Sequence, residues 1–505
     1  MPFSLVILWT DALVFVLVII VTILVWYIRR HAHLRAPWRR VGKNASGMVA
    51  LTILLFFIVI GLLDSIHFRL ALENRFNNGE QVYSVEVLSL FDVVVGPMRT
   101  SIEKTYSAPL SAYLYAKETV DLPDGRQVRE YSRLKFGGAH LQDPETQKID
   151  DITARIVAGI GTGLTGWLLI VILLTLFLAR HHQESFSRSL ARIWHGTTEI
   201  PWHAVLITLA IIFSLLGIIL TLSPYYHVLG TDKVGQDVLY QALKSIRTAL
   251  VIGAITTLIM LPFALMLGIM AGYFRGWVDD VIQYIYTTLN SIPSVLLIAA
   301  VVLIMQVYIE THPELFETTA ERADLRLLFL CIILGITSWT GLCRLLRGET
   351  LKLREMEYIQ AAHAFGVSHW RILSRHILPN VMHIVLIATV MDFSGLVLAE
   401  AVLSYVGVGV DPSMISFGTM INAARLEMAR EPMVWWTLMA AFGFMFTLVL
   451  SANLFSDAVQ HAFDPRIQTL SEKARILHRS KNRKLNPVTP AISTNASEKK
   501  QTPSA

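Results

Sequence analysis

Nine long apolar runs dominate the amino-acid sequence and limit the folds that are open to it. They lie at about 12–27, 47–64, 156–179, 203–223, 246–273, 283–309, 326–343, 382–408 and 433–455. A helix needs roughly 20 predominantly apolar residues to cross the hydrocarbon core of a bilayer. The sequence therefore predicts an all-α polytopic membrane protein with about nine spans.

Charged residues are scarce and lie beside the apolar runs. Of the 505 residues only 16% are charged and 54% are hydrophobic, whereas soluble domains contain about 25% charged residues. The net charge of +5 lies in short loops and a C-terminal tail, where membrane topology accounts for it, so we expect no nucleic-acid partner. Cys331 and Cys343 lie in or at the edge of one apolar run, which fits neither a disulfide framework nor a thiolate metal site.

The distribution of Lys and Arg predicts the orientation of the spans. The loop 29–43 holds basic residues and no acidic one: Arg29, Arg30, Arg35, Arg39, Arg40 and Lys43. Such a loop faces the cytoplasm, which places the N-terminus outside and the C-terminus inside. Alternation also puts these segments inside: 180–202, 274–282, 344–380 and the tail after 456. The first apolar run precedes its basic residues, which favours a retained anchor over a signal peptide.

Polar stretches divide the chain further. We expect residues 65–150 to form a small mixed α/β extracytoplasmic domain. Polar and apolar residues alternate at Gln81–Val87, and a turn is predicted at Pro123-Asp124-Gly125. The tail 465–505 lacks apolar periodicity and predicts a disordered cytoplasmic segment. The remaining parts are expected to be N-terminal anchors (1–64), an added span with a basic loop (151–200) and a membrane core (201–464).

A cytoplasmic segment between two spans, 355–379, is the most informative part of the core. It is amphipathic, and Ala361, Ala362 and Ala364 give a surface that another protein can approach closely. Gly366 permits a sharp turn between two short helices, and Pro379 lies near the start of the next span, where its missing N–H costs little. From spacing alone, an ordinary loop of a polytopic protein fits this segment equally well.

This segment resembles the Glu-Ala-Ala loop of the permeases of binding-protein-dependent ABC importers. The pattern there is Glu-Ala-Ala, three residues, Gly, and then Ile-x-Leu-Pro. The sequence keeps these positions: Ala361, Ala362, Gly366, Leu378 and Pro379. It has Gln360 where the pattern has Glu, and His376 where the pattern has Ile. The change at Gln360 argues against a salt bridge from that position but not against a docking helix.

The resemblance extends over most of residues 200–466, to the C-type permease subunits of dipeptide and oligopeptide importers. An external signature after the first core span consists of Gly230, Thr231, Asp232, Gly235 and Asp237. Further motifs follow in the family's order: Gly276–Asp280, Ser291–Ser294, Glu400–Gly409, Phe417–Met420 and Asp464–Arg466. The first 200 residues lie outside the pattern, so the resemblance implies a core of about six spans with an N-terminal extension of about three.

The resemblance also implies a function and partners. It implies a permease of a bacterial cytoplasmic (inner) membrane that imports peptide-like solutes. It also implies partners: a second permease in a heterodimer, two ABC ATPase subunits and an extracytoplasmic solute-binding protein. The segment 355–379 would seat in the ATPase and transmit its motion. The sequence carries no phosphate-binding loop, because Gly42-Lys43 is followed by Asn44 and lacks an upstream glycine. We therefore expect a non-catalytic subunit, and no cofactor or metal is implied.

Two acidic residues fall within or near the end of a predicted span. Burying a carboxylate at the bilayer centre costs roughly 2.5–3.5 kcal/mol, so such residues face a cavity or a partner. We expect Asp392 to line the translocation path and to attract a peptide's amino group; an interhelical hydrogen bond or a protonated carboxyl fits equally well. Glu400, which belongs to the family pattern, is the second residue expected on the translocation path. An ion-gradient-driven transporter or channel would use the same two carboxylates.

Other motifs have structural interpretations. Gly161–Gly166 matches a dinucleotide fingerprint as a string but lies in an apolar run, so helix packing through Gly159 and Gly163 is favoured. Asp279 and Asp280 point about 100° apart on a helix, which favours capping over paired acid/base chemistry. Asp232 is expected to cap an external amphipathic helix.

The domain 65–150 has three interpretations. It could contact the solute-binding protein or brace the partner permease. A structural plug between added anchors fits the sequence equally well. A receptor-like or enzymatic membrane protein would place its activity there, but the domain shows no defensible cluster of catalytic residue types.

Overall fold

The computed structural model describes residues 3–77, 80–121, 127–316 and 318–463. Residues up to Ala462 form one compact unit. The predicted tail 465–505, the motif Asp464–Arg466 and the turn at Pro123-Asp124-Gly125 lie outside the described residues.

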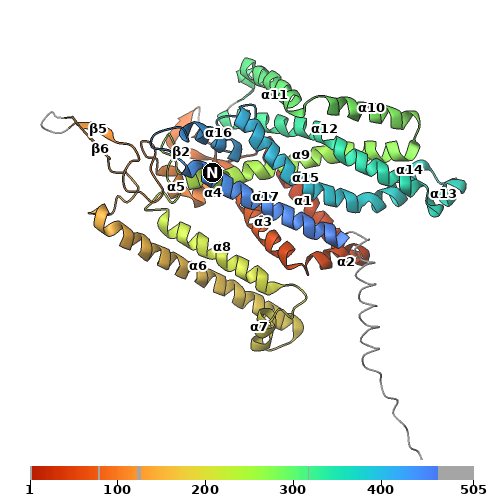
Figure 1. Ribbon diagram of the computed structural model, residues 1–505, viewed down its shortest axis with the longest axis horizontal. Helices are drawn as coiled ribbons and strands as arrows, with labels where there is room; N and C mark the ends of the chain where they lie inside the picture. The colour runs from red at the N-terminus through yellow and green to blue at the C-terminus, as the bar shows by residue number, and fades with distance from the viewer. Residues whose placement is uncertain (1–2, 78–79, 122–126, 317, 464–505) are drawn as a thin grey trace, which may run out of the picture. The chain divides into compact units, whose positions relative to one another are not determined.

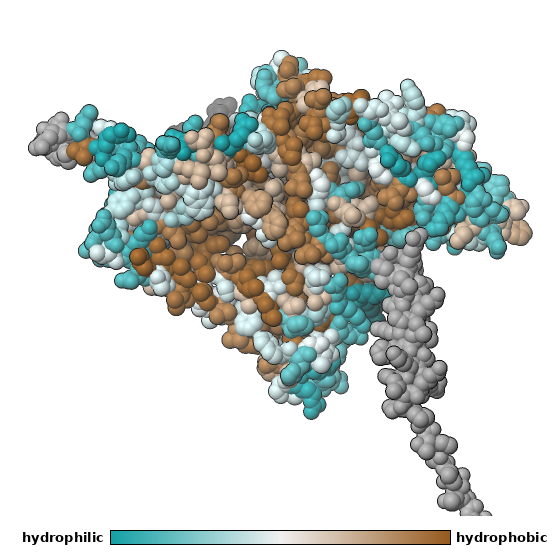
Figure 2. Space-filling model, viewed as in Figure 1, coloured by the Kyte–Doolittle hydropathy of each residue, from teal (hydrophilic) through white to brown (hydrophobic). Residues whose placement is uncertain are grey.

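Nine helices in the described part are long and apolar enough to cross a membrane, which confirms the predicted number of spans. They are α1 (Trp9–Arg30), α3 (Ala45–Asp64), α6 (Pro144–His182), α8 (Trp202–Leu222), α9 (Val238–Phe274), α11 (Ser294–Thr311), α12 (Thr319–Arg354), α15 (Leu378–Val406), which continues a helical stretch from His369, and α17 (Trp436–Phe463). Figure 2 shows apolar side chains gathered along these helices and polar ones toward their ends.

The buried core follows α9. Its first third packs with α3, α16 (Phe417–Glu427) and α17, its middle with α11 and α12, and its last third with α12 and the start of α15. Figure 1 shows α9 and α12 running side by side through this bundle. Cys331 and Cys343 are buried free thiols on α12.

Helices α6 and α8 form a hairpin that depends on small residues. A Cβ atom at Gly163 would lie 2.2 Å from the backbone oxygen of Phe213, and one at Gly217 would lie 2.1 Å from that of Gly159. Only glycine allows this approach, which is a common way for membrane helices to associate. The helix-packing interpretation of Gly159 and Gly163 is confirmed.

One predicted span is interrupted. The run 283–309 was expected to form a single helix, but α10 (Trp277–Ser291) ends before Pro293 and α11 begins at Ser294. Pro293 has no N–H to donate, and the residue before a proline is pushed into extended conformation. Ile292 has φ −91° and ψ 128° accordingly. The prediction of one continuous helix was wrong at this point.

The ends of the bundle differ in structure. At one end lie the strands β1 (Phe3–Val6), β2 (His67–Asn77), β3 (Glu80–Tyr83) and β4 (Leu88–Ser89), the hairpin β5 (Glu118–Asp121) and β6 (Gln127–Glu130), and the short helices α4 (Leu90–Val94), α5 (Gly96–Thr100) and α16. At the other end lie α2 (Ala32–Val41), α7 (Phe186–Trp194), α13 (Glu357–Ala364) and α14 (His369–Ile372) (Figure 1).

The sheet joins the N-terminal residues to the segment 65–150, which were expected to be separate parts. β2 pairs with β1, β3 and β4, and each pairing is antiparallel. β1 precedes the first span, yet Phe3 lies opposite Leu70. The sheet is therefore not confined to residues 65–150, because its strand β1 lies outside that range.

Candidate coupling and translocation sites

The segment 355–379 forms an elbow of two short helices, α13 and α14. Gly366 has φ +74°, a left-handed conformation that favours glycine. Its N–H donates to the carbonyl of His363 (3.0 Å), and the N–H of Val367 donates to that of Ala362 (3.1 Å). These bonds satisfy carbonyls at the end of α13, so the predicted turn at Gly366 is confirmed.

The elbow has a buried face and an exposed face. Ile359 and Ile372 are buried against Leu346 of α12 and the end of α9. On the other side Phe365 is 87% exposed and Trp370 is 79% exposed. Large exposed aromatic residues outside the spans are typical of protein-binding surfaces. The small residues of this segment do not predict this aromatic pair, although two aromatics in a polar loop were a readable signal.

Polar contacts tie the elbow to the turn that follows α9. The Tyr273 hydroxyl lies 2.7 Å from Nδ1 of His369. Arg275 pairs with Glu355 at 2.5 Å, and the Gln360 amide donates to the same carboxylate at 3.4 Å. Gln360 thus makes a contact within its own chain, where the family pattern has an acid.

The second half of the elbow continues into a span without a break. From α14 the chain passes through a π-helical segment, Leu373–Ile377, directly into α15. Leu378 and Pro379 are the first residues of α15, where the missing N–H of proline costs little. A push on the elbow therefore reaches the bundle through a continuous helical stretch.

The two candidate carboxylates on α15 have different surroundings. Asp392 is half-buried and forms no hydrogen bond or ion pair with any described residue. Glu400 is buried, and its carboxylate accepts hydrogen bonds from Ser404 (2.6 Å) and Ser416 (2.9 Å). Ser416 is the N-cap residue of α16. Glu400 thus fixes α16 against α15, while the Asp392 carboxyl group has no hydrogen-bond partner in the described part of the chain.

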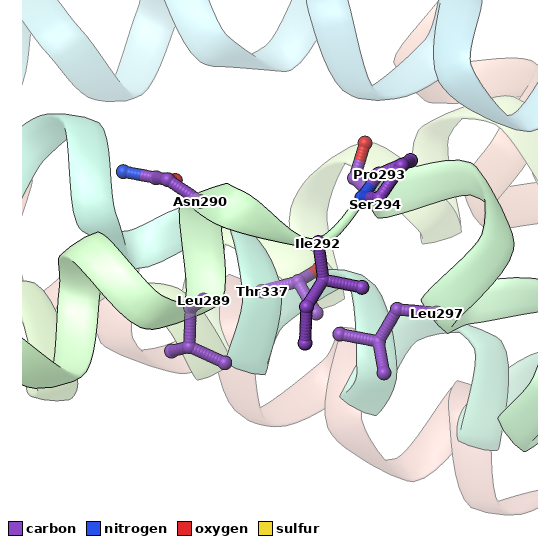
Figure 3. A pocket seen from close by; sticks show the side chains of 7 residues that line it. All are labelled: Leu289, Asn290, Ile292, Pro293, Ser294, Leu297 and Thr337. Atoms are coloured by element: carbon purple, nitrogen blue, oxygen red, sulfur yellow. The ribbon is translucent and has the colours of Figure 1, made fainter.

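A small open pocket of about 200 Å³ lies where α10 and α11 separate. Its lining residues, shown in Figure 3, are Leu289, Asn290, Ile292, Pro293, Ser294, Leu297 and Thr337. The Thr340 hydroxyl donates to the Asn290 side chain at 3.1 Å. Non-helical backbone at membrane depth is tolerated only inside protein or beside water. The pocket therefore offers neutral hydrogen-bonding groups at an interruption of the membrane-embedded chain.

The external signature binds the N-terminal extension. The N–H of Ser107 donates to the Thr231 hydroxyl (2.6 Å), and the N–H of Glu103 donates to the carbonyl of Gly235 (2.9 Å). A Cβ at Gly235 would lie 1.8 Å from the Glu103 carbonyl oxygen, and one at Gly230 would lie 2.4 Å from that of Ser107. The glycines of the signature thus leave room for residues 103–107.

Asp237, not Asp232, caps the helix that follows the signature. Its carboxylate accepts hydrogen bonds from the N–H groups of Leu239 (2.9 Å) and Tyr240 (3.1 Å). Asp232 instead accepts from the N–H of Gln236 (2.8 Å) within the preceding turn. The prediction for Asp232 was wrong because α9 begins only at Val238 and runs unbroken to Phe274.

A buried charged trio lies behind the signature. His227 Nδ1 is 2.8 Å from Asp237, and its Nε2 is 3.5 Å from Glu103. Burial alone would lower the pKa of His227, but hydrogen bonds and charge attraction from Asp237 and Glu103 outweigh it and raise the pKa to about 9. Burial would likewise raise the pKa of Glu103, but His227 and three backbone N–H groups lower it to about 2.

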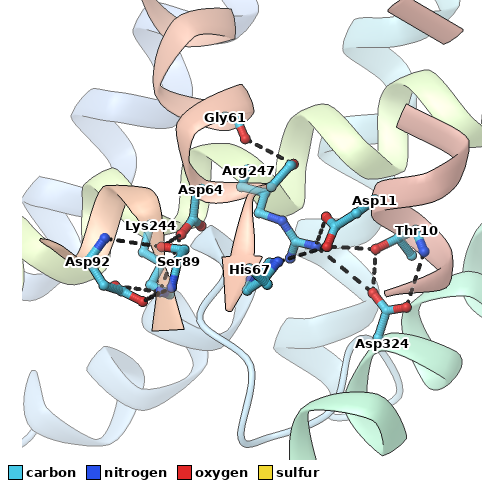
Figure 4. A network of polar contacts seen from close by, with 11 residues as sticks. Thr10, Asp11, Gly61, Asp64, His67, Ser89, Asp92, Lys244, Arg247 and Asp324 are labelled. Carbon is cyan, nitrogen blue, oxygen red and sulfur yellow. Dashed lines mark hydrogen bonds and ion pairs between the residues drawn. The ribbon is translucent and has the colours of Figure 1, made fainter. Parts of the chain in front are cut away.

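A second polar network fastens the first span to the core (Figure 4). The guanidinium of Arg247, on α9, contacts Asp11 of α1 at 2.5 Å and lies 3.9 Å from Asp324 of α12. Asp11 also contacts His67 of β2 at 2.7 Å, and Thr10 bonds to Asp324. All five side chains are buried. No local sequence pattern predicts this network, since its members lie far apart in the chain.

Lys244, one turn before Arg247, makes a parallel connection. It contacts Asp92 at 2.6 Å and Asp64 at 3.3 Å. Burial would raise the pKa of Asp92, but the Lys244 ammonium lowers it below its usual range. Asp64 ends α3 and Asp92 lies in α4, so two adjacent turns of α9 bind α1, α3 and α4 of the extension directly and β2 through Asp11.

The described residues contain no group of three or more His, Cys, Asp or Glu side chains placed to hold a metal ion. Asp279 pairs with Arg347 of α12 at 2.6 Å, whereas Asp280 forms no ion pair with any described residue. The structure thus combines three features: a bundle of apolar spans, a helical elbow with an exposed aromatic face, and a polar interruption at membrane depth. This combination is that of a transport permease.

Comparison with known proteins identifies the family. The model of the binding-protein-dependent transport system inner membrane component family matches residues 264–469. The oligopeptide transport system permease protein OppC of Mycobacterium bovis is 31% identical over 249 residues, which are 49% of this chain and 79% of the relative. The glutathione transport system permease protein GsiD of Pectobacterium atrosepticum is 32% identical over 48% of this chain and 74% of the relative.

A third relative, the dipeptide transport system permease protein DppC of Lactococcus lactis, is 29% identical over 48% of this chain and 64% of the relative. The chain belongs to the binding-protein-dependent transport system inner membrane component family. It is a multi-pass permease subunit of an ABC importer, of the C type, with an N-terminal extension. The comparisons support this function and not that of an ion-gradient-driven transporter.

Proposed function

We propose that the chain forms one half of the membrane path of an ATP-driven importer of peptides or similar small solutes. The names of its relatives refer to oligopeptides, dipeptides and glutathione, which are all short peptides. The chain pairs with a second permease in a heterodimer and works with two ABC ATPase subunits and an extracytoplasmic solute-binding protein. It is itself non-catalytic, and the ATPase subunits supply the energy.

The elbow carries this proposal. Its buried isoleucines fix it to α9 and α12, while Phe365 and Trp370 present a free aromatic face. This face is joined to α15 by a continuous helical stretch. When the ATPase subunits close, their movement is therefore transmitted to the spans. The residues Gln360, Ala361, Ala362, Gly366, Leu378 and Pro379 form the coupling loop.

We also propose the orientation and the domain limits that the sequence predicts. The N-terminus lies outside and the C-terminus lies in the cytoplasm, so that α2, α7 and the elbow share the inner face. Support comes from the common position of these helices at one end of the bundle (Figure 1). The parts are 1–64, 65–150, 151–200, 201–464 and 465–505.

The translocation path passes Asp392 and the pocket between α10 and α11. The carboxylate of Asp392 has no partner among the described residues, so it is available to a cationic group of the solute. Asn290 and Thr337 would offer neutral hydrogen bonds to a peptide backbone. Glu400, in contrast, acts on the path only by positioning α16.

The experiment replaces the exposed aromatics by Phe365→Ala and Trp370→Ala. If these exposed aromatics become buried against the ATPase subunits, their loss should weaken binding of those subunits at least about tenfold. ATP-dependent uptake into vesicles that contain the full importer should fall with it. The matched control is Trp194→Ala on α7, a tryptophan that is 64% exposed at the same end of the bundle.

Two results would overturn the proposal. One is normal ATPase binding and uptake in the double variant. The other is solute uptake by vesicles that contain this chain alone, without nucleotide, because the chain would then need no motor.

A further inference from the structure

The Arg and Lys residues of α2 and its flanks have no acidic partner among the described residues. Arg29, Arg30, Arg35, Arg39, Arg40 and Lys43 are all exposed, and none forms an ion pair with any described residue. Nine other arginines do pair with carboxylates: Arg69, Arg99, Arg155, Arg192, Arg247, Arg275, Arg326, Arg347 and Arg430. Others, such as Arg180, Arg371 and Arg375, form no ion pair with any described residue. The segment 29–43 thus holds a block of six exposed basic side chains that have no acidic partner among the described residues.

The geometry holds this block at the membrane surface. α2 lies between the spans α1, which ends at Arg30, and α3, which begins at Ala45. Such short connections cannot carry a ten-residue helix far from the bilayer. Arg35 and Arg39 are four residues apart and share a face of α2, while Val41 is buried and anchors the end of the helix.

The neighbouring span favours contact with lipid. In α1 only Thr10 and Asp11 are buried, so most of its apolar side chains are open to acyl chains. Near its inner end the Arg30 guanidinium lies 3.8 Å from the centre of the Trp26 ring. An aromatic residue and a cation at this level are typical of the headgroup region. Acyl chains beside α1 would place their headgroups next to α2.

We propose that α2 and the ends of its two flanking spans form a binding site for anionic phospholipids of the cytoplasmic leaflet. Basic clusters immediately beside a span attract anionic headgroups, and an amphipathic surface helix adds apolar contact. Bound lipid would fix the inner end of the extension, whose outer end is already fixed by Asp11 and Arg247. The site goes beyond the proposed transport function and does not depend on the solute.

The test compares charge removal with charge retention. The full chain is purified in a mild detergent as wild type, as Arg35→Gln/Arg39→Gln/Arg40→Gln and as the matching triple Lys variant. Binding of phosphatidylglycerol and phosphatidylethanolamine is then titrated by native mass spectrometry. We expect the Gln variant to bind phosphatidylglycerol at least about tenfold more weakly, the Lys variant to bind it as the wild type does, and phosphatidylethanolamine binding to be unchanged.

Arg29, Arg30 and Lys43 remain in both variants, so the positive bias that orients the extension is kept. Equal phosphatidylglycerol binding by all three proteins would overturn the proposal and leave the block as a topology signal. Unchanged lipid binding with loss of the ATPase subunits from the Gln variant would overturn it in favour of a protein partner. Equal weakening in the Lys and Gln variants would also overturn it, since charge would then not be the cause.

Discussion

At the residue scale, His227 links the folding of the external face to pH. It lies between Asp237 and Glu103 with its side chain 4% exposed, so its charge balances two buried carboxylates. Asp237 caps α9, and Glu103 lies in the segment 103–107 of the extension, which binds the signature. Loss of the proton from His227 would leave these carboxylates uncompensated and would loosen the extension from the core.

The direction of the pH effect follows from the pKa of His227. Because folding raises this pKa from 6.5 to about 9, the stabilisation is complete below about pH 6.5 and is lost as the pH rises through about 9. The loss is on the order of 3 kcal/mol. Glu103 acts in the opposite window, and its contribution is lost as the pH falls from about 4.5 toward 2.

Thermal unfolding of the detergent-solubilised chain checks this prediction. The Tm should fall between pH 7 and pH 10 in the wild type and should change less in His227→Gln. His312→Gln, at a partly exposed histidine, is the matched control and should keep the wild-type profile. A His227→Gln profile identical to the wild type would contradict the assignment.

Asp392 provides the test of the membrane path. Asp392→Asn removes the charge and nearly keeps the shape of the side chain, so uptake of a cationic peptide should fall about tenfold or more. ATPase binding and protein yield should stay unchanged, because Asp392 has no partner within the described chain. The measurement is ATP-dependent uptake by the reconstituted importer. Unchanged uptake would remove Asp392 from the path.

At the element scale, the elbow depends on the conformation of Gly366. Its φ is +74°, and a Cβ there would meet no atom within 4 Å. A substitution is therefore opposed by backbone strain alone, about 1–2 kcal/mol for an L-residue and least for Asn. We expect Gly366→Val to impair uptake and ATPase binding, and Gly366→Asn to remain close to the wild type.

ATP-dependent uptake at equal protein yield distinguishes these variants. Since Gly366 is exposed, neither change should reduce the amount of folded chain. Equal activity of the Val and Asn variants would show that the turn geometry does not matter for coupling.

Elements differ in how far the sequence predicts them. The spans could be predicted because the bilayer demands long apolar helices, and this demand is local in sequence. The turn at Gly366 could also be predicted, because the preference of glycine for such a turn is local in sequence. The end of α10 depends on Pro293, which was visible but was read as part of a longer apolar run. The exposed face of Phe365 depends on which side of α13 packs against α9 and α12, and no local pattern specifies that.

At the scale of the whole molecule, long-range contacts decide what the extension does. β1 pairs with β2 across the first two spans, and Asp11 contacts Arg247 at a separation of 236 residues. Contacts of this kind follow from the folded arrangement and leave no periodic signal. The sequence therefore separated an extension from a core, whereas the described residues up to Ala462 form one compact unit.

The extension also holds the outer loops of the core. Besides the bonds of residues 103–107 to the signature, the Tyr115 hydroxyl donates to the carbonyl of Met433 at 3.0 Å, and its ring packs edge-on against Trp436 at the start of α17. The loops before α9 and α17 are thus fixed by the same external segment. We propose that this segment braces the outer face on which the solute-binding protein delivers its cargo.

Two deletions separate this bracing role from a direct docking role. Replacing residues 70–145 by a flexible linker removes the brace and should abolish uptake that depends on the binding protein, while the elbow still binds the ATPase subunits. Removing only 118–130, the hairpin β5–β6 that projects from the outer end (Figure 1), leaves residues 103–115 in place and should preserve uptake. Uptake lost in both deletions would mean that the hairpin itself contacts the binding protein. Uptake kept in both would reduce the extension to a structural plug, because the core would then hold its outer loops without help.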